Sequence, residues 1–279
     1  MITCNLMGGL GNQIFQIFAT ISYAIKSKNQ FKFLNLSTLG SGSETIRNTF
    51  WNSFFNRLKP FLINSIPQPI HVIREKGFSF KQLPINEMIG MNCIICGYFQ
   101  SYKYFHENYE MICRIIGLEK MKAELIKKLN LEHEYLNKCV SMHFRLGDYK
   151  KLQDYHPLAT YEYYKNALNF IKKKSIEPYN ILYFCEDADI DDVILKINSL
   201  ENEFPEYKFI RGDNRLADWE QMLFMSCCHH NIIANSSFSW WGAYFNSSSD
   251  KIVCYPSVWF GEIAKKNTND LCPPEWNKI

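Results

Sequence analysis

The sequence lacks the charge imbalance typical of proteins that bind nucleic acids over a broad surface. Its 279 residues include 31 lysines and arginines against 28 aspartates and glutamates, which leaves a formal net charge of only +3 with the two signs interspersed. A general nucleic-acid binder would carry a strongly basic face. We therefore expect no nucleic-acid partner, while a few cations remain available for a local anion site.

Long hydrophobic runs are also missing. The apolar stretch at 14–25 has twelve residues and is interrupted by Gln16 and Ser22, whereas a helix that spans a bilayer needs roughly 20 apolar residues. No basic, hydrophobic and cleavable leader opens the sequence. These absences predict a protein without a membrane span, and we expect a cytoplasmic location.

The sequence lacks the paired ligands of a zinc site. Most of its ten cysteines lie in apolar surroundings such as NCIICGYF and KIVCYP, where they read as small buried hydrophobic residues. Only Cys93 and Cys96 have C-x2-C spacing, and no second cysteine or histidine pair follows at a zinc-site interval. We expect no metal site, and scattered free thiols are typical of a reducing compartment.

The glycine-rich segment MGGLGNQ at 7–13 lacks part of the dinucleotide-binding fingerprint. Gly9 and Gly11 supply the first two glycines of G-x-G-x-x-G, but Ile14 stands in the third position. No acidic residue lies about 20 positions further on to bind a ribose, and the G-K-[ST] of a Walker A loop is missing. A nicotinamide-dependent oxidoreductase is therefore only a distant alternative.

What the sequence does contain is an alternation of strand and helix patterns. Hydrophobic residues make up 47% of the chain, enough for a large core. The first part predicts a strand at 2–7, a helix through about Lys26, a strand at 31–36, an irregular stretch from 40 to 90, a strand at 92–99 and a helix at 119–138. The second part predicts strands at 139–146, 180–187, 207–211, 231–235 and 251–255 with helices between them.

Such an alternation predicts an α/β protein with a doubly wound parallel sheet. We place the domain boundary near residue 137, so that 1–137 form an N-terminal α/β domain and 138–279 a C-terminal Rossmann-like domain. Ligands of such folds bind at the carboxyl ends of the strands, and three predicted strand ends carry reactive side chains.

The first of these ends is SMHFRLGDY at 141–149. Period-two alternation places Ser141, His143 and Arg145 on one face of the strand, with Val140, Met142, Phe144 and Leu146 on the other. A central strand of a parallel sheet is normally apolar on both faces, so a histidine and an arginine there indicate an anion or substrate site. The alternative is a buried Arg–Asp pair that only closes the GDY turn.

The other two ends are acidic and hydroxyl-rich. Glu186 and Asp187 end the strand LYFCED, where they either cap the next helix or hold ribose or base hydroxyls or a cation. The segment ANSSFSWWGA at 234–243 opens directly into a helix, whose free N–H groups and positive dipole end favour an anion. Arg145 and this helix start together would form a clamp for a diphosphate.

Three segments in this order, GGLGNQIFQ, HFRLGDY and NSSFSWWGAYFN, resemble the α-1,2-fucosyltransferase family. FCED at 184–187 looks like the family's F-S-D-D strand end, and the resemblance extends from residue 7 to about 260. It implies a GT-B-like fold in which two Rossmann-like domains face a cleft. It also implies that GDP-β-L-fucose is the donor and that a glycan acceptor receives fucose on the 2-hydroxyl of a terminal sugar. The implied transfer inverts the anomeric carbon and requires no cofactor and no metal.

The resemblance also implies roles for individual residues. Arg145 would hold the diphosphate and stabilise the leaving GDP, and His143 would line the same pocket. The implied donor-binding residues are Gly9, Gly11, Asn12, Gln13, Asp148, Asp187, Asn235, Ser236, Ser237 and Phe238. Among these, Ser236, Ser237 and Phe238 would contact phosphates, Asp187 the nucleoside, and Asn12 and Gln13 would face the cleft from the N-terminal domain.

One departure from the family pattern affects the expected function. The family usually has a second arginine where this chain has Leu146. By alternation Leu146 points away from Arg145, so the clamp can survive, and the change bears on donor identity, acceptor choice or rate. A transferase for another GDP-sugar and a weakly active sugar-nucleotide or glycan-binding module are therefore the alternatives. For the base that activates the acceptor hydroxyl, His143, Asp148, Glu75 and direct displacement with weak base assistance all stay open.

Overall fold

The computed structural model describes residues 1–40, 45–175 and 179–279. The chain divides into two compact units, and unit 2 runs from Met121 to Lys265 and from Pro274 to Ile279. Unit 1 consists of Met1–Lys120 and Lys266–Pro273. The division therefore falls earlier than the boundary at residue 137 expected from the sequence.

The division lies inside helix α3 (Leu118–Leu129), which is bound to unit 2 from Lys122 onwards. The Lys122 ammonium donates to the backbone carbonyl of Phe245 over 3.1 Å, and Lys128 forms an ion pair with Glu220 at 2.6 Å. These contacts anchor most of the helix in unit 2. The boundary between the units therefore lies near the start of the amphipathic segment 119–138, whereas the sequence had placed it near the end of that segment.

Unit 2 contains one six-stranded sheet in which every paired strand is parallel. The strand order is β10-β9-β8-β11-β12-β13. The strands are β8 (Cys139–His143), β9 (Asn180–Phe184), β10 (Lys208–Arg211), β11 (His230–Ile232), β12 (Val253–Tyr255) and β13 (Asn277–Lys278). The helices are α4 (His133–Leu136), α5 (Tyr161–Lys174), α6 (Ile190–Glu203), α7 (Asp218–Cys227) and α8 (Ser237–Tyr244), with 3₁₀ turns η5 (Gly147–Lys151) and η6 (Asp187–Asp189).

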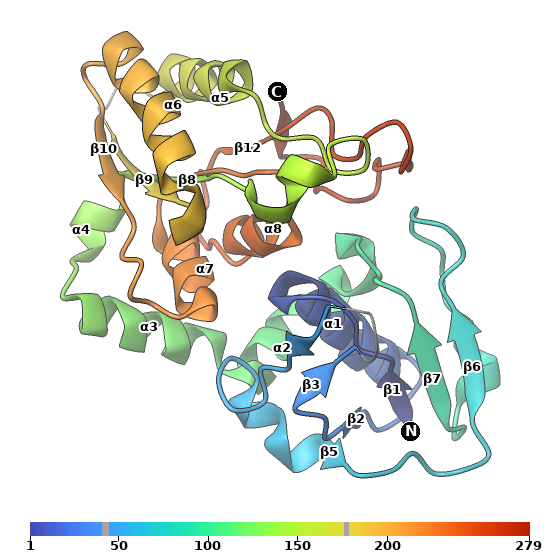
Figure 1. The fold of residues 1–279 in the computed structure, drawn as a ribbon. Helices are drawn as coiled ribbons and strands as arrows, with labels where there is room; N and C mark the ends of the chain where they lie inside the picture. The colour runs from blue at the N-terminus through green and yellow to red at the C-terminus, as the bar shows by residue number, and fades with distance from the viewer. Residues whose placement is uncertain (41–44, 176–178) are drawn as a thin grey trace. The chain divides into compact units, whose positions relative to one another are not determined.

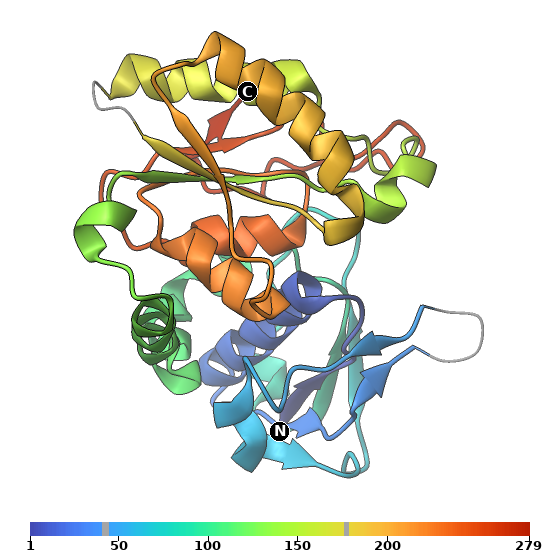
Figure 2. The same cartoon turned by 60° about the vertical axis from the view of Figure 1, so that its left-hand side comes forward.

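The helices of unit 2 cover both faces of this sheet. Figure 2 shows α5 and α6 on one face and α7 and α8 on the other. A core cluster joins the apolar faces of α5 and α6 to Val140, Met142 and Phe144 of the β8 segment. On the opposite face, Asn231 donates to Ser141 of β8 over 2.7 Å and to the Met225 carbonyl of α7 over 2.9 Å.

Unit 1 contains a smaller parallel sheet of order β1-β7-β6 (Figure 1). Its strands are β1 (Ile2–Cys4), β6 (His71–Arg74) and β7 (Cys93–Cys96); β2 (Phe33–Leu34) pairs with β5 (Leu62–Ile63), and β3 (Thr38–Leu39) with β4 (Arg47–Asn48). Its helices are α1 (Leu10–Lys26) and α2 (Tyr109–Ile116), with 3₁₀ turns η1 (Asn56–Phe61), η2 (Asn86–Met88), η3 (Tyr102–Tyr104) and η4 (His106–Asn108). Helix α1 is almost wholly buried, which explains its near-continuous apolar pattern.

The segment Lys266–Pro273 belongs to unit 1 although it lies near the C-terminus in sequence. Asp270 explains why, because its carboxylate accepts from the Phe80 N–H over 3.2 Å and pairs with Lys103. The Asp270 carbonyl also accepts from the Ser101 hydroxyl. Two stretches of unit 1 that are far apart in sequence are thus joined through one aspartate.

The predicted α/β, GT-B-like class is confirmed in its two units and their parallel sheets; that the units face a cleft stays a prediction. Helices α1 and α5 and the positions of β8 to β12 along the chain follow the sequence prediction closely. The helix predicted at 119–138 is instead two helices, α3 and α4, separated at 130–132. Strand β6 was missed in the irregular stretch from 40 to 90, of which 41–44 lie outside the described residues.

A buried histidine network lies at the start of β11, at the amino ends of the strands in unit 2. His230 is 2% exposed; its Nδ1 accepts from the Ile252 N–H over 3.0 Å, and its Nε2 lies 3.1 Å from the Tyr179 hydroxyl. Burial, with a smaller effect of His229, lowers the pKa of His230 to about 4. The imidazole is therefore neutral at neutral pH, and protonation would put a hydrogen on Nδ1 against the Ile252 N–H.

We predict that acidification destabilises the protein partly through His230. The unfolded chain takes up a proton near pH 6.5 and the folded one only near pH 4, so stability contributed by this group is present above pH 6.5 and is lost as the pH falls toward 4. Between about pH 7 and about pH 5 the loss should be about 2 kcal/mol. Urea unfolding of the wild type and His230→Gln at both values checks this, and equal losses in the two proteins would contradict it.

Candidate functional site

The strand order of unit 2 contains one point where the direction of chain progress reverses. From β8 the chain moves to β9 and β10 on one side, and then returns to β11 on the other side of β8. In open parallel sheets ligands bind outside the carboxyl ends of the two strands that flank such a point. The segments that follow β8 and β11 are therefore the place to look for a site.

The β8 segment divides its side chains between two faces, as the alternation predicted. Val140, Met142, Phe144 and Leu146 all belong to the buried apolar cluster under α5 and α6. His143 lies on the other side and is 5.5 Å from the Phe238 ring of α8, centroid to centroid. Burial of Leu146 at 6% exposure shows that this residue serves the core.

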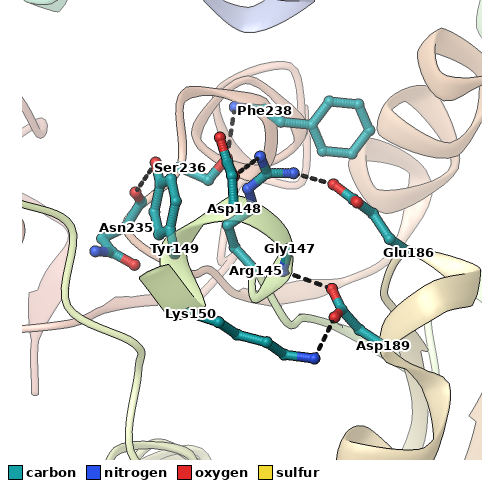
Figure 3. A network of polar contacts seen from close by, with 10 residues as sticks. All are labelled: Arg145, Gly147, Asp148, Tyr149, Lys150, Glu186, Asp189, Asn235, Ser236 and Phe238. Atoms are coloured by element: carbon teal, nitrogen blue, oxygen red, sulfur yellow. Dashed lines mark hydrogen bonds and ion pairs between the residues drawn. The ribbon is translucent and has the colours of Figure 1, made fainter. Parts of the chain in front are cut away.

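Arg145, just past the end of β8, is the centre of an ion-pair network (Figure 3). Its guanidinium binds the carboxylate of Glu186 through Nη1 and that of Asp148 through Nη2, the latter at 2.5 Å. It also lies over the Tyr149 ring, 5.1 Å from the centroid. Arg145 and Asp148 are therefore brought together as a pair, with the second acid supplied by the end of β9.

The electrostatics of this group favour a permanent cation beside a neutral imidazole. Burial opposes the charge on Arg145, but Glu186 and Asp148 outweigh it, so the pKa of the guanidinium is raised. Burial and the nearby Arg145 charge lower the pKa of His143 to about 3. At neutral pH the positive charge here belongs to Arg145, and His143 acts only as a neutral hydrogen-bonding group.

The segment after β11 supplies hydroxyl and backbone donors. Ser236 is the N-cap of α8, where its hydroxyl accepts from the Phe238 N–H over 3.3 Å. Ser237 and Phe238 form the first turn of the helix and are half-buried. The Tyr149 hydroxyl donates to the Asn235 carbonyl over 3.4 Å, which ties this segment to the turn that carries Arg145.

Two buried polar atoms at this point have no hydrogen-bond partner among the described residues, His143 Nδ1 and Asn235 Oδ1. The Asn235 amide nitrogen is occupied by the carbonyls of Pro157 and Trp259, at 2.8 and 3.2 Å. Buried polar atoms in folded proteins are nearly always satisfied, so each exception needs an explanation. His143 ends β8 and Asn235 follows β11, so both atoms lie at carboxyl ends of strands, where sheets of this kind bind ligands.

Asp187 lies in the same edge of the sheet but makes a separate set of contacts. Its carboxylate binds Arg211 of β10 and accepts from Asn214 over 3.1 Å. These hydrogen bonds, from Asn214 and then Arg211, lower the pKa of Asp187. Within the described part of the chain these contacts do not join Asp187 to Arg145, and its nucleoside role stays a prediction. Its neighbour Glu186 stands at the N-cap position of η6, but the Glu186 side chain makes no capping hydrogen bond and pairs with Arg145.

Sequence reasoning missed Asp189, which holds the Arg145 turn in place. Asp189 is 3% exposed; its carboxylate accepts from the Gly147 N–H over 2.7 Å and binds Lys150 at 2.7 Å. Gly147 has φ of +40°, a conformation that favours glycine, and a Cβ there would lie 3.2 Å from the Glu186 carboxylate. The signal available was the third acid in EDAD, which the sequence did not distinguish from a helix cap.

The N-terminal glycine segment lies in unit 1, where the structure changes the predicted roles. Gly8 is the glycine that the turn requires, with φ of +75° and a Cβ position 2.5 Å from Asn12 Nδ2. Gly9 is the N-cap of α1 and has no atom within 4 Å of its Cβ position, and Gly11 is buried in the first turn of α1. Among the described residues no side chain therefore blocks the approach of another molecule to the backbone at Gly9.

The two amides of this segment differ in their surroundings. Asn12 is half-buried, and its oxygen accepts from the Gln100 side chain over 2.7 Å. Gln13 is 1% exposed and donates to the carbonyls of Gly8 and Asn48, both at 2.9 Å. The Gln13 side chain thus turns into unit 1 and ties the glycine turn to β4; that Asn12 and Gln13 face a cleft stays a prediction.

In the ranges 1–40, 45–175 and 179–279, histidines, cysteines and acids do not gather in groups of three with a geometry suited to a metal ion. No helix in those ranges has both the length and the apolar character needed to cross a membrane.

Comparison with known proteins gives a consistent set of similarities. The family model described as glycosyl transferase family 11 matches residues 1–279. An alpha-1,2-colitosyltransferase of Escherichia coli is 29% identical over 302 residues, which cover 100% of this chain and 99% of that protein. A galactoside 2-alpha-L-fucosyltransferase of Caenorhabditis elegans is 22% identical over 307 residues, covering 98% and 74%. Among solved structures, a mutant of Arabidopsis thaliana FUT1 in complex with GDP aligns with 90% of this chain and 69% of that one, at 9% identity and a TM-score of 0.48.

We predict that Asp189→Asn lowers the free energy of unfolding by about 2 kcal/mol, because one buried carboxylate serves both the Gly147 N–H and Lys150. The matched control is Asp192→Asn, which removes only an exposed partner of Lys150 at 2.6 Å and should change stability little. Urea unfolding at neutral pH measures both. Equal effects of the two substitutions would show that Asp189 does not have this role.

Proposed function

Because the chain belongs to glycosyl transferase family 11, we propose that it transfers L-fucose from GDP-β-L-fucose to the 2-hydroxyl of a terminal sugar on a glycan. The proposal includes inversion at the anomeric carbon and a reaction that requires no metal ion. Glycosyl transfer is the activity of the family. The fucosyl donor is supported by the three sequence segments that resemble α-1,2-fucosyltransferases and by the similarity to a fucosyltransferase of Caenorhabditis elegans.

The observation that carries the proposal is the position of Arg145 at the carboxyl end of β8, beside the N-terminus of α8. A guanidinium presents a planar fork that binds two phosphate oxygens at once. The first turn of α8 offers backbone N–H groups and the positive end of a helix dipole. A diphosphate held between them would replace Glu186 and Asp148 as the partners of Arg145.

The proposed transfer is a displacement at the anomeric carbon of the donor sugar. The acceptor oxygen forms a bond to that carbon from the face opposite the diphosphate, while the bond from the carbon to the phosphate oxygen breaks. GDP leaves with the electron pair, and the acceptor hydroxyl loses its proton. Negative charge thus develops on the departing phosphate, where preorganised cations and N–H donors lower the barrier most.

A metal-independent reaction is part of the proposal because Arg145 provides a fixed positive charge where the leaving group would lie. Its raised pKa keeps it charged at every pH at which the protein is folded. His143, with a pKa of about 3, adds no charge but keeps a free ring nitrogen at neutral pH for a hydrogen bond. We assign His143 to donor binding and not to proton transfer.

A second candidate function is transfer of another sugar from GDP, and a specific observation favours colitose. The colitosyltransferase of Escherichia coli is more similar to this chain, at 29% identity, than the fucosyltransferase of Caenorhabditis elegans, at 22%. A weakly active binding module is disfavoured, because Leu146 packs in the core and its replacement of an arginine leaves Arg145 and its partners in position.

The experiment that tests the function is a donor panel with a defined acceptor. GDP-L-fucose, GDP-colitose, GDP-mannose and GDP alone are compared by thermal shift, because binding to the folded state raises apparent stability. Transfer to methyl β-galactoside is then followed by GDP release and by product linkage analysis. The expected result is turnover with GDP-L-fucose and a new bond at the 2-hydroxyl; turnover with GDP-colitose alone would replace the donor, and binding without turnover would support a binding module.

We predict that EDTA leaves the rate of transfer unchanged. The reason is that Arg145 and the first turn of α8 are proposed to stabilise the departing diphosphate without a divalent ion. Initial rates with EDTA and with added Mg²⁺ or Mn²⁺ check this. A loss of activity that a divalent ion restores would show that the clamp is insufficient.

We predict that Arg145→Ala lowers kcat by about 100- to 1,000-fold, the loss expected for one main stabiliser of transition-state charge. Arg145→Lys keeps the charge without the fork and should fall between alanine and wild type. Arg215→Ala is the matched control, because Arg215 is 86% exposed and its ion pair is with Asp213, outside the Arg145 network. A near-wild-type kcat in Arg145→Ala would remove Arg145 from the reaction.

A further inference from the structure

Two polar side chains lie opposite each other in the middle of the parallel sheet of unit 2. Ser141 of β8 and Asn231 of β11 are partners in the strand register, at 2% and 0% exposure. Central strands of a parallel sheet are normally apolar on both faces. Ser141 precedes His143 by two residues and therefore lies on the same face. Polar groups at these positions indicate a role other than filling the core.

The hydrogen bonds of Asn231 fix the direction of its side-chain amide. The amide nitrogen donates to the Ser141 hydroxyl over 2.7 Å and to the backbone carbonyl of Met225 in α7 over 2.9 Å. The amide oxygen accepts from the side-chain nitrogen of Asn246 over 2.8 Å. A buried polar network in which every member is bonded favours a single arrangement. Asn231 therefore presents its oxygen to Asn246 in one orientation.

Asn246 lies just past the C-terminal end of α8 and is 4% exposed. Besides Asn231, its side-chain nitrogen reaches the carbonyls of Cys228 and His229, at 2.8 and 3.1 Å. Its side-chain oxygen accepts from the Ser248 N–H over 2.9 Å. The end of α8 is thus bound to β11 and to the segment between α7 and β11.

Helix α8 connects these hydrogen bonds to the proposed diphosphate site. It has eight residues, so its two ends are only about 12 Å apart. A helix this short moves as a rigid body. A displacement of Asn246 at one end therefore also displaces Ser237 and Phe238, which form the first turn at the other end.

We infer that Asn231 and Asn246 are positioning residues for the donor diphosphate. Their hydrogen bond holds α8 at one place on the sheet, so that the N–H groups of its first turn keep a constant separation from the Arg145 guanidinium (Figure 3). The inference rests on the proposed function, because it requires a diphosphate held between Arg145 and α8. The two asparagines act through α8 and not by contact with the diphosphate.

A constant separation matters because the diphosphate has a fixed size. Binding groups have to be held within about 0.5 Å of their productive positions, and a misplacement of about 1 Å can cost about 100-fold in rate. Directional hydrogen bonds between amides set such a position more closely than apolar contacts do. The alternative is that the network only stabilises the fold, and the two roles differ in their effect on GDP affinity.

The test measures GDP affinity of the full chain by calorimetry, well below the melting temperature of each variant. Asn231→Leu removes the amide with a side chain of similar size, and Ser141→Ala removes only the hydroxyl that orients it. Leu200→Ala is the matched control. Leu200 is fully buried in α6, on the face of the sheet opposite α8 (Figure 2), so its truncation lowers stability at a distance from the network.

Asn231→Leu should weaken GDP binding by about 10-fold or more, the loss expected when a hydrogen bond to a charged phosphate is misplaced. Ser141→Ala should weaken it by a smaller factor of about three. Leu200→Ala should bind GDP with wild-type affinity although its melting temperature is lowered.

A double-mutant cycle with Arg145→Ala provides a measurement that a purely structural role would not change. Without Arg145 the diphosphate rests on α8 alone and follows the helix when it moves. With GDP followed to saturation, Asn231→Leu should therefore weaken binding by a smaller factor in the Arg145→Ala background than in wild type. The same factor in both backgrounds would show that Asn231 does not set the separation of α8 from Arg145.

The outcomes separate the inference from the proposed function. Wild-type GDP affinity in Asn231→Leu, or an equal loss in Leu200→Ala, overturns the inference and leaves the transferase intact. If Asn231→Leu does not fold, Ser141→Ala decides: weaker GDP binding supports the inference, and unchanged binding overturns it. A wild type that binds no GDP overturns the proposed function, and the inference with it.

Discussion

The positive charge of Arg145 is the constraint on which the arrangement of unit 2 depends. A guanidinium at the end of a buried strand loses much of its hydration, and this loss must be offset by nearby negative charge. Glu186 and Asp148 provide that charge from two different loops. Since both are more exposed than Arg145, they are partners that an anion with a better fit to the guanidinium can replace.

Hydrogen bonds that do not involve the guanidinium also hold the loops around Arg145. Asp189 fixes the Gly147 backbone and Lys150, and the Tyr149 hydroxyl reaches the Asn235 carbonyl on the segment after β11. The result is that two loops and a helix start are joined across the sheet by hydrogen bonds of moderate strength. Hydrogen-bond donors that are held in place before a reaction need no rearrangement when negative charge develops on a bound group, and preorganisation matters for this reason.

The sequence predicted the parts of this arrangement that depend on local pattern. Alternation in SMHFRL placed Arg145 and His143 opposite Leu146, and the serines before SWW marked the start of a helix. It missed strand β6, whose four residues lie at a sheet edge with three of them exposed, so they lack the alternation of a half-buried strand. It also overlooked Asp189, because its partner Gly147 is 42 positions away in sequence.

Unit 1 is discontinuous, since Lys266–Pro273 completes a fold that otherwise ends at Lys120. Asp270 in that segment satisfies Phe80, Ser101 and Lys103 at once. Recombination among related genes at a single crossover near residue 120 would separate the two stretches and leave these groups without their native partner. Unit 1 is therefore inherited as two linked pieces, and it would diversify more readily by substitution within its loops than by exchange of whole N-terminal halves.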